Sequence, residues 1–352
     1  MIPWRKALTL APFLLVPAAF VTEFLHAKPL VTFAAAGLAL LPLAGLMGKA
    51  TEHLAARAGA GLGAFLNATF GNAAELILGF AALREGLTGV VKASITGSII
   101  GNSLLVLGGA ILAGGLRRPQ QTFNSAAAGV NSTLLALSAT ALILPATFHH
   151  LVPGLPVAEE RMSLVISAIL LLAYGASLFF AFKTHKHLYV GDAHHLEGEA
   201  WSTRKSLGIL IVATVLVAFV SEVLVAQVEH LSKDFGLGEV FVGVVLLAFF
   251  GNAAEHSSAI FMAWRNRMDV ALGITVGSST QLALFVAPVL VFAGYFMGQW
   301  VDLVFTMPEV AAVAVSAWIV SLVSHDGESH WLEGVLLLAV YAVLGVTFFF
   351  LP

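Results

Sequence analysis

Eleven predominantly apolar stretches run through this chain, each close to the length of about 20 residues that a helix needs to cross a membrane. Only 11% of the 352 residues are charged, whereas soluble domains carry roughly 25%, so polar groups cannot cover a globular surface. The sequence therefore predicts an all-α membrane protein with 11 transmembrane helices in contact with membrane lipid. The predicted helices cover approximately residues 7–25, 29–48, 62–83, 88–114, 124–147, 161–182, 206–229, 239–264, 269–297, 304–324 and 331–351.

The lysine and arginine residues predict the orientation, because cytoplasmic loops carry an excess of them. With 11 spans, 12 of the 17 lie on the side of the N-terminus and five on the other side. We therefore expect a multi-pass protein of the plasma (inner) membrane, with the N-terminus in the cytoplasm and the C-terminus outside. Residues 7–25 are expected to stay as a helix, since Thr22, Glu23 and His26 follow where a secretion signal would have a small-residue cleavage site.

Several functional classes are disfavoured by what the sequence lacks. It contains no cysteine, which removes disulfides and thiolate metal sites. It has no basic run, so nucleic acid is not an expected partner. Because P-loop, HExxH and nucleophile-elbow motifs are also absent from the sequence, we expect neither an enzyme nor a bound cofactor.

A motif in the third predicted helix returns 180 positions later in the eighth. Phe70–Ile77 reads FGNAAELI, and Phe250–Ser257 reads FGNAAEHS. The same offset pairs Gly97–Ser98 with Gly277–Ser278. The two copies start five helices apart, and five is odd, so they must run in opposite directions through the membrane. An inverted repeat of this kind is typical of secondary transporters, which build a midplane site at the repeat interface.

The longest polar interruption divides the chain near its middle. We expect an extra N-terminal helix in residues 1–28 and a first inverted repeat of five helices, the second to the sixth, in 29–182. A cytoplasmic linker is expected in 183–205. The second inverted repeat, with the seventh to the eleventh helix, then covers 206–352.

The repeated motif places an amide and a carboxylate three residues apart, on one face of each helix: Asn72 with Glu75, and Asn252 with Glu255. Two carboxylates brought together inside a membrane repel each other unless a cation or protons neutralise them. Carboxylate, amide and backbone oxygens are the ligands that a hard ion such as Ca²⁺ takes. A structural hydrogen bond or ion pair is the alternative, but no lysine or arginine is repeated with the glutamates.

Neighbouring polar residues are expected to complete the site. Gly71 and Gly251 precede the motif and should weaken the helix there, which would free backbone carbonyls as ligands. The polar run Gly97–Ser103, which contains Asn102, and the run Gly277–Gln281 supply the other walls. Ordinary helix packing remains an alternative role for any single hydroxyl in these runs.

The motifs GNAAELI followed by GSIIGN, and GNAAEH followed by GSSTQ, resemble the two signature repeats of the calcium/cation–proton antiporters (CAX), a branch of the cation/Ca²⁺ exchanger superfamily. The similarity covers nearly the whole chain, and the second motif, with His256 and Gln281, is its most specific part. The resemblance implies that Glu75 and Glu255 bind Ca²⁺ and protons alternately, and it favours H⁺ over Na⁺ as the driving ion. Gly101 stands where the second half has Gln281, so the two walls are expected to differ. The residues implied to line the site are Asn72, Asn252, Ser98, Ser278 and Gln281.

The charges then predict how an antiporter would export Ca²⁺ from the cytoplasm in exchange for H⁺. With both glutamates ionised the site is neutral with one Ca²⁺, and with both protonated it is neutral without metal. Either loaded state can pass between inward-open and outward-open forms, whereas the empty dianionic site is held back by its burial cost. This mechanism predicts at least two H⁺ per Ca²⁺.

Alternatives remain at this point. The main substrate could be another cation, Mn²⁺ or Na⁺, or the chain could be a cation channel or an intramembrane enzyme with two carboxylates as acid and base. Channels usually gather identical filters around one axis, whereas two inverted copies favour alternating access. The sequence also leaves open whether the chain forms a homo-oligomer.

Two weaker signals lie outside the motifs. Glu52, Glu222 and Glu229 are predicted at or near helix ends, where they would line a proton or ion path or would simply be solvated. By resemblance, the linker could sense Ca²⁺, and its histidines could bind a transition metal; a solvated linker is the plainer alternative. The titratable linker residues concerned are His185, His187, Asp192, His194, His195, Glu197 and Glu199.

Overall fold

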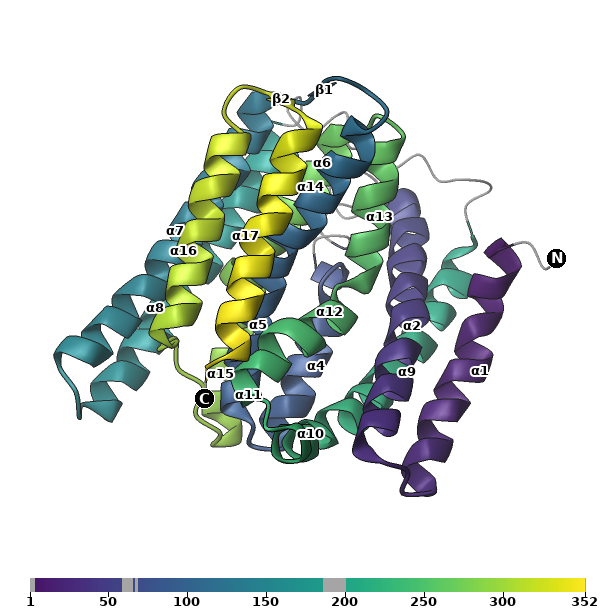
Figure 1. Cartoon of the computed structure of the whole chain (residues 1–352), viewed down its shortest axis with the longest axis vertical. Helices are drawn as coiled ribbons and strands as arrows, with labels where there is room; N and C mark the ends of the chain where they lie inside the picture. The colour runs from purple at the N-terminus through teal and green to yellow at the C-terminus, as the bar shows by residue number, and fades with distance from the viewer. Residues whose placement is uncertain (1–3, 59–65, 67–68, 186–200, 352) are drawn as a thin grey trace.

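The computed structural model of the chain describes residues 4–58, 66, 69–185 and 201–351. Nearly all of this part is helical, and the long helices pack side by side in one bundle (Figure 1). The α-helices are α1 (Trp4–Phe24), α2 (Pro29–Ala58), α4 (Ala73–Arg84), α5 (Thr88–Ile100), α6 (Leu107–Gly115), α7 (Ser125–Leu151), α8 (Pro156–Phe179), α9 (Thr203–Ala226), α10 (Val228–Phe235), α11 (Glu239–Phe241), α12 (Ala248–Gly251), α13 (Ala253–Trp264), α14 (Met268–Gln281), α15 (Ala287–Met297), α16 (Met307–Val323) and α17 (Trp331–Phe349).

Short π-helical segments interrupt or extend several of these helices without ending them. They cover Gly101–Val106 between α5 and α6, Phe180–Thr184 after α8, Val242–Leu247 between α11 and α12, and Leu282–Val286 between α14 and α15. The prediction of an all-α chain misses one small feature. Two-residue strands, β1 (Gln121–Thr122) and β2 (Glu328–Ser329), pair antiparallel at one end of the bundle.

The apolar helices agree with a chain that crosses a membrane several times. Within the described residues, seven continuous helical stretches are long and apolar enough to span. The pair Glu239–Gly251 and Glu255–Trp264, bent by 60° at its break, makes an eighth if it counts as one span. Leu14–Phe24 and Met307–Val323 are apolar but shorter. Because most of residues 62–68, where the third helix was predicted to start, lie outside the described residues, the number of 11 spans stays a prediction.

Several helices are longer than their apolar windows. The second helix was predicted to end at residue 48 but continues to Ala58, and the sixth was predicted to begin at residue 161 but begins at Pro156. The reason is that hydropathy detects the part of a helix in the hydrocarbon, whereas backbone hydrogen bonding continues past the first polar side chains. Proline is also well suited to the first position of a helix, where no hydrogen bond from its nitrogen is needed.

Burial separates a central helix from peripheral ones. In the most apolar window of Thr88–Gly115, 83% of the residues are buried, against 17% in Pro156–Thr184 and in Trp331–Phe349. The continuous helix of α5 and α6 therefore runs through the middle of the bundle. The long apolar helices at the periphery expose much of their surface, as expected where lipid is the solvent.

The central helix is approached closely by the segment that leads to the second motif. A Cβ atom on Gly97 would overlap the backbone of Val244, and one on Gly243 would lie 2.5 Å from the Cβ of Ala93. Glycine at both positions allows the two backbones to come together. This contact places the Gly-Ser element of the first half beside the helix that carries the second motif.

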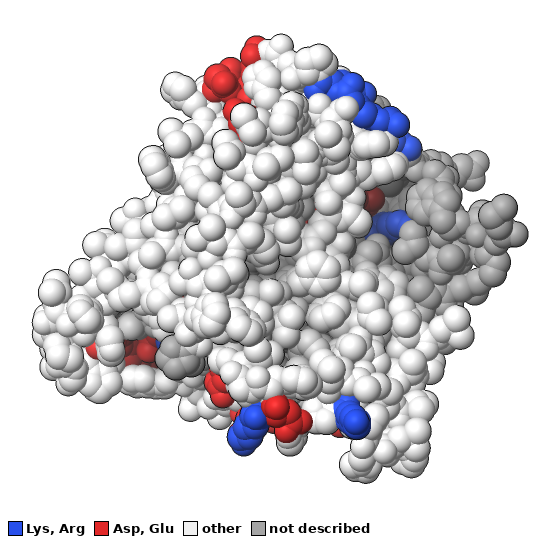
Figure 2. All heavy atoms as spheres, viewed as in Figure 1, with Lys and Arg blue, Asp and Glu red and all other residues white. Residues whose placement is uncertain are grey.

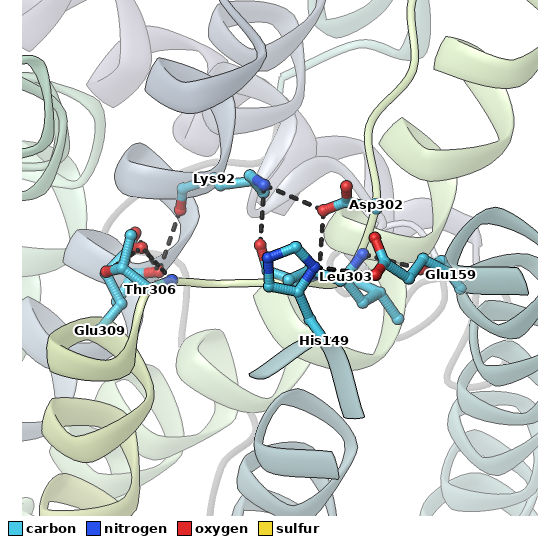
Figure 3. Close-up of polar contacts among 10 residues, drawn as sticks. Lys92, His149, Glu159, Asp302, Leu303, Thr306 and Glu309 are labelled. Atoms are coloured by element: carbon cyan, nitrogen blue, oxygen red, sulfur yellow. Dashed lines mark hydrogen bonds and ion pairs between the residues drawn. The ribbon is translucent and has the colours of Figure 1, made fainter. Parts of the chain in front are cut away.

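A polar cluster ties the first turns of α5 to the segment before α16 (Figure 3). The Nζ of Lys92 donates to Oδ1 of Asp302 at 2.9 Å. The buried Glu309 accepts from the backbone N and the Oγ1 of Thr306 at 2.9 and 2.7 Å, which caps α16, and from Oγ1 of Thr96 at 3.2 Å. These bonds fix α5 at one end of the bundle. Nearby, His149 and Glu159 join α7 to α8 at 2.8 Å.

Candidate ion-binding site

Both copies of the repeated motif stand at a break in a helix. A turn at Gly71 and Asn72 precedes α4, and Asn252 separates α12 from α13, where the helix axis bends by 60°. The expected weakening of the helix is therefore present in both halves. It places Glu75 and Glu255 in the first turn of α4 and of α13. There, the partial positive charge of the helix N-terminus favours a negative side chain.

Both glutamates of the repeated motif have buried carboxylate oxygens without a hydrogen-bond partner among the described residues. Glu75 is 7% exposed, and neither of its carboxylate oxygens has a hydrogen-bond partner among the described residues. The buried Oε2 of Glu255 also has none. The two carboxylates are near enough to interact electrostatically. A Cβ built on Gly251 would lie 3.7 Å from Cγ of Glu75, so the glutamate of the first motif lies against the glycine of the second.

The amides of the motifs bond to the serines of the opposite half. Ser278 Oγ donates to Oδ1 of Asn72 at 2.6 Å, and Nδ2 of Asn252 donates to Oγ of Ser98 at 2.6 Å. Positions 72 and 252, and positions 98 and 278, are each 180 apart, so the same pair occurs twice, crosswise between the halves. Nδ2 of Asn72 also donates to Oε1 of Gln281 at 2.5 Å.

Asn102 joins these two pairs into one network. It is fully buried, and its Nδ2 donates to Oδ1 of Asn252 at 2.9 Å and to Oγ of Ser278 at 3.0 Å. The expected inequality of the walls at Gly101 is present, but Asn102 supplies an amide one residue later, at the start of a π-helical segment. Its own Oδ1 is buried without a hydrogen-bond partner among the described residues. Such a buried polar atom is costly unless something binds it.

Sequence reasoning missed a second contact between the polar runs. The hydroxyls of Ser103 and Ser279 lie 3.0 Å apart, and Ser279 also donates to the carbonyl of Ile99 at 3.2 Å. Both serines are fully buried and join α14 to the central helix. They belong to the same polar runs as the expected residues, but nothing in the sequence distinguishes them from serines that bond their own helix.

The three glutamates expected near helix ends lie outside the network. Glu52 is half-buried near the end of α2. Glu222 forms an ion pair with Arg84, and its side chain is 40% exposed. Glu229 is exposed and pairs with Lys233 at 2.7 Å within α10. These positions fit either a proton or ion path or solvated helix ends.

The predicted linker is described only at its two ends. His185 stacks on Phe180 with ring centroids 3.9 Å apart. At the other end, Trp201 accepts a hydrogen bond from Arg57 at 2.5 Å and stacks on His53 at 4.3 Å, which holds the start of the second half against α2. The remaining residues of interest lie outside the described residues: His187, Asp192, His194, His195, Glu197 and Glu199.

The available ligands are oxygens of carboxylates, amides and hydroxyls. In the part of the chain that the structure describes, no group of three or more His, Cys, Asp or Glu side chains is placed to hold a metal ion. A permanent site for a transition metal usually needs such a cluster. Two carboxylates with neighbouring amide oxygens suit a hard cation that binds and leaves.

Comparison with known proteins agrees with this geometry. A family model described as "Sodium/calcium exchanger protein" matches residues 28–183 and 205–350. The chain belongs to this family. The exchanger is 46% identical over 357 residues to the Ca²⁺/H⁺ antiporter of Aphanothece halophytica, and the alignment covers 96% of this chain and 95% of that protein.

Two further relatives support the assignment to the exchanger family. The Ca²⁺/H⁺ antiporter ChaA of Bacillus subtilis is 42% identical over 342 residues, which cover 96% of this chain and 97% of the relative. The solved structure of native YfkE superposes with a TM-score of 0.86 at 39% identity, covering 98% of this chain and 99% of that chain. The family expected from the repeated motifs is thereby confirmed, and the relatives from Aphanothece halophytica and Bacillus subtilis are antiporters by name.

Proposed function

We propose that this exchanger exports Ca²⁺ from the cytoplasm in exchange for H⁺, with Glu75 and Glu255 binding either one Ca²⁺ or protons. The observation that carries the proposal is the set of buried carboxylate oxygens without hydrogen-bond partners, next to a network that joins the two halves. A buried carboxylate without a partner is costly as an anion, so it needs a proton or a cation. The names of the relatives support Ca²⁺ and H⁺ as the two ions.

The proposed ligands of Ca²⁺ are the oxygens that the network leaves unused. They are the carboxylate oxygens of Glu75, Oε2 of Glu255 and Oδ1 of Asn102. Ca²⁺ takes about six to eight oxygens, so backbone carbonyls near the breaks at Gly71 and Gly251, together with water, would complete the set. The remaining lining residues hold Asn102 and the two motifs in place through hydrogen bonds to one another: Asn72, Ser98, Asn252, Ser278 and Gln281.

The exchange cycle follows from the charge of the site. One Ca²⁺ with two carboxylates is neutral, and so are two protonated carboxyls without metal. Both forms can be enclosed in the bilayer during the change between inward-open and outward-open states, while the empty dianion is held back by its burial cost. Each Ca²⁺ therefore moves against at least two H⁺.

We further propose that the chain consists of two inverted five-helix repeats, residues 29–182 and 206–352, after an extra helix in 1–28 and around a linker in 183–205. The crosswise pairs Asn72–Ser278 and Asn252–Ser98 support this arrangement, because equivalent residues pair in both copies, although the serine donates in the first pair and the asparagine in the second. The family model supports it too, since it matches in two segments with a gap at the linker.

Contacts between helix ends support the count of 11 spans. With 11 spans, the segments of β1 and β2 lie on one side of the membrane, and these strands pair. Arg117 and Trp264 fall on the same side and stack. On the opposite side, Lys92 pairs with Asp302. The excess of Lys and Arg on the first of these sides makes it the cytoplasmic one, with the N-terminus inside and the C-terminus outside.

We assign the three glutamates near helix ends to the mouths of the ion path. Glu52 lies on the proposed cytoplasmic side, and Glu222 and Glu229 lie on the outer side. Their partial exposure supports the assignment, since an acidic side chain in contact with water raises the local concentration of cations. The ion pair of Glu222 with Arg84 must open for Glu222 to meet a passing ion.

The direct test is Ca²⁺ uptake into proteoliposomes under an imposed pH gradient. The wild type should accumulate Ca²⁺ against its gradient, and Glu75→Gln and Glu255→Gln should each abolish the uptake, because neither variant can neutralise Ca²⁺ with two carboxylates. Glu85→Gln is the matched control, since Glu85 is exposed at the end of the same helix as Glu75. Full transport in both site variants would overturn the proposed roles.

The same vesicles distinguish the competing substrates. Mn²⁺ or Na⁺ that is driven by the pH gradient more efficiently than Ca²⁺ would replace Ca²⁺ as the main substrate. Flux that follows the Ca²⁺ gradient alone, without dependence on pH, would indicate a channel instead of an antiporter.

A further inference from the structure

Three arginines converge on the last turn of α13. The guanidinium of Arg117 lies over the ring of Trp264, with Cζ 3.6 Å from the ring centroid. Nη1 of Arg118 donates to the backbone carbonyl of Trp264 at 3.3 Å, and Cζ of Arg265 lies 4.2 Å from the centroid of the Phe261 ring. Figure 2 shows Lys and Arg side chains gathered over the ends of α6 and α13, at one end of the bundle.

The contacts of Arg117 and Arg118 hold their guanidinium groups without neutralising them. A ring face and a backbone carbonyl carry no net charge, and among the described residues neither Arg117 nor Arg118 forms an ion pair with a carboxylate. An arginine that stacks through its flat face keeps the N–H groups at its edge for another acceptor. Two adjacent guanidinium groups in this state attract an anion with several oxygens, such as a phosphate.

An apolar surface continues from the arginines along the same helix. Ile260, Phe261 and Trp264 are each 38% exposed. Ile260 lies four positions and Phe261 three positions before Trp264, so both lie next to Trp264 on one side of α13. Tryptophan is also enriched where a helix leaves the hydrocarbon for the headgroup layer. With Trp264 at this boundary, the arginines would lie at headgroup level and the exposed apolar side chains beneath them at the level of the acyl chains.

We propose that this Trp264 surface, formed by Arg117, Arg118, Trp264, Phe261 and Ile260, binds an anionic phospholipid of the leaflet that faces the cytoplasm. The lipid phosphate accepts hydrogen bonds from the two arginines, and an acyl chain lies along Ile260 and Phe261. A zwitterionic lipid offers the same phosphate but brings its own cation, so it is attracted less. The bound lipid rests against α13, the helix that carries Glu255.

The test is native mass spectrometry of the purified full chain in detergent, titrated with dioleoyl phosphatidylglycerol or with dioleoyl phosphatidylcholine. The wild type should bind phosphatidylglycerol more tightly than phosphatidylcholine. The double variant Arg117→Gln, Arg118→Gln should bind phosphatidylglycerol about thirtyfold more weakly, as expected for two lost charges. Arg204→Gln is the matched control, since Arg204 is exposed in the first turn of α9, away from this surface.

A charge-preserving variant separates lipid binding from folding. Arg117→Lys with Arg118→Lys should keep most of the preference for phosphatidylglycerol, even if the glutamine variant proves unstable. Equal affinity of the wild type for the two lipids would overturn the proposal. So would an undiminished affinity in a folded glutamine variant, or loss of affinity in a folded lysine variant. Displacement of the lipid by excess inorganic phosphate would assign the surface to free phosphate instead.

Discussion

At the scale of single residues, the site is defined by which polar atoms have partners and which do not. The side-chain amides of Asn72 and Asn252 are held by serines of the opposite half. The carboxylate oxygens of Glu75 and Oδ1 of Asn102 have no hydrogen-bond partner among the described residues. The network fixes the segments that carry the glutamates through Asn72 and Asn252, while the carboxylate oxygens of Glu75 remain available to an ion.

Asn102 tests this view, because it belongs to the network and also carries an unused oxygen. We expect Asn102→Ala to lower the free energy of unfolding by about 1–3 kcal/mol, since Asn252 loses its donor in a buried place. The KM for Ca²⁺ should rise, because one proposed ligand is gone. The measurements are thermal unfolding in detergent and the Ca²⁺ dependence of uptake.

Thr133→Val is the matched control for Asn102→Ala. The Thr133 hydroxyl donates to a carbonyl of its own helix on an exposed face, so its loss should change neither quantity noticeably. If Asn102→Ala matches this control in both measurements, the amide has no role in the site.

At the scale of elements, function depends on helices that are broken or brought unusually close. The breaks at Gly71–Asn72 and Asn252 set the glutamates at helix N-termini. The contact of Gly97 with the backbone of Val244 sets the neighbouring Ser98 within reach of the second motif. One π-helical segment begins within the first polar run, at Gly101, and another begins directly after the second, at Leu282; such segments are frequent at functional sites.

The close contact at Gly97 gives the first element-scale prediction. Gly97→Ala should lower the free energy of unfolding by about 1–3 kcal/mol and impair transport, because the new methyl group overlaps a backbone that cannot move aside freely. Gly129→Ala is the control, since no described atom lies within 4 Å of a Cβ at that position. There, the better helix propensity of alanine should leave thermal unfolding unchanged or raise its midpoint. Equal behaviour of the two variants would contradict the packing argument.

The polar cluster that ties the first turns of α5 to the segment before α16 gives the second element-scale prediction. Glu309→Ala removes a helix cap and the bond from Thr96, and we expect a loss of about 2 kcal/mol in thermal unfolding. Glu333→Ala removes a comparable cap at the start of α17, where the glutamate accepts from the backbone of His330. Its cost should stay near 1 kcal/mol. If both substitutions cost the same, the tie between α5 and α16 contributes nothing measurable.

The sequence identifies the residues of the candidate site better than it predicts where each helix begins and ends. The 180-residue offset identifies both motifs, because buried amides and carboxylates stand out in an apolar chain. It does not reveal that Asn102, one residue after Gly101, contacts Asn252 in the way that Gln281 contacts Asn72, since the offset pairs Gln281 with Gly101. Helix ends such as that of α2 at Ala58 also differ from prediction, because hydropathy locates the hydrocarbon and hydrogen bonding continues beyond it.

At the scale of the whole molecule, the proposed 11 spans connect the repeat, the orientation and the transport direction. The count of 11 spans assigns segments that contact each other to the same side of the membrane, such as β1 with β2 and Lys92 with Asp302. An inverted pair of halves gives two related conformations, one open to each side, if the halves exchange their arrangements. Export of Ca²⁺ then needs only an inward proton gradient.

Because the sequence contains no cysteine, the topology can be tested with single introduced cysteines, and no native cysteine has to be replaced first. Single substitutions Glu85→Cys and Asp234→Cys should react with a membrane-impermeant maleimide in right-side-out vesicles, because both positions are assigned to the outer side. Arg204→Cys and Asp326→Cys should react only after permeabilisation. Inverted labelling of all four would reverse the orientation, and reaction of Glu85→Cys and Asp326→Cys from the same side would contradict the count of 11 spans.

The most direct test of the central claim is the ratio of proton flux to Ca²⁺ flux in proteoliposomes, measured together in wild type and in Glu75→Gln. Two carboxylates that exchange one Ca²⁺ for their protons predict that at least two H⁺ leave for each Ca²⁺ that enters, and that both fluxes vanish together in the variant. Ca²⁺ movement with fewer than two H⁺, or Ca²⁺-dependent proton flux that persists in Glu75→Gln, would contradict a shared site formed by the two glutamates.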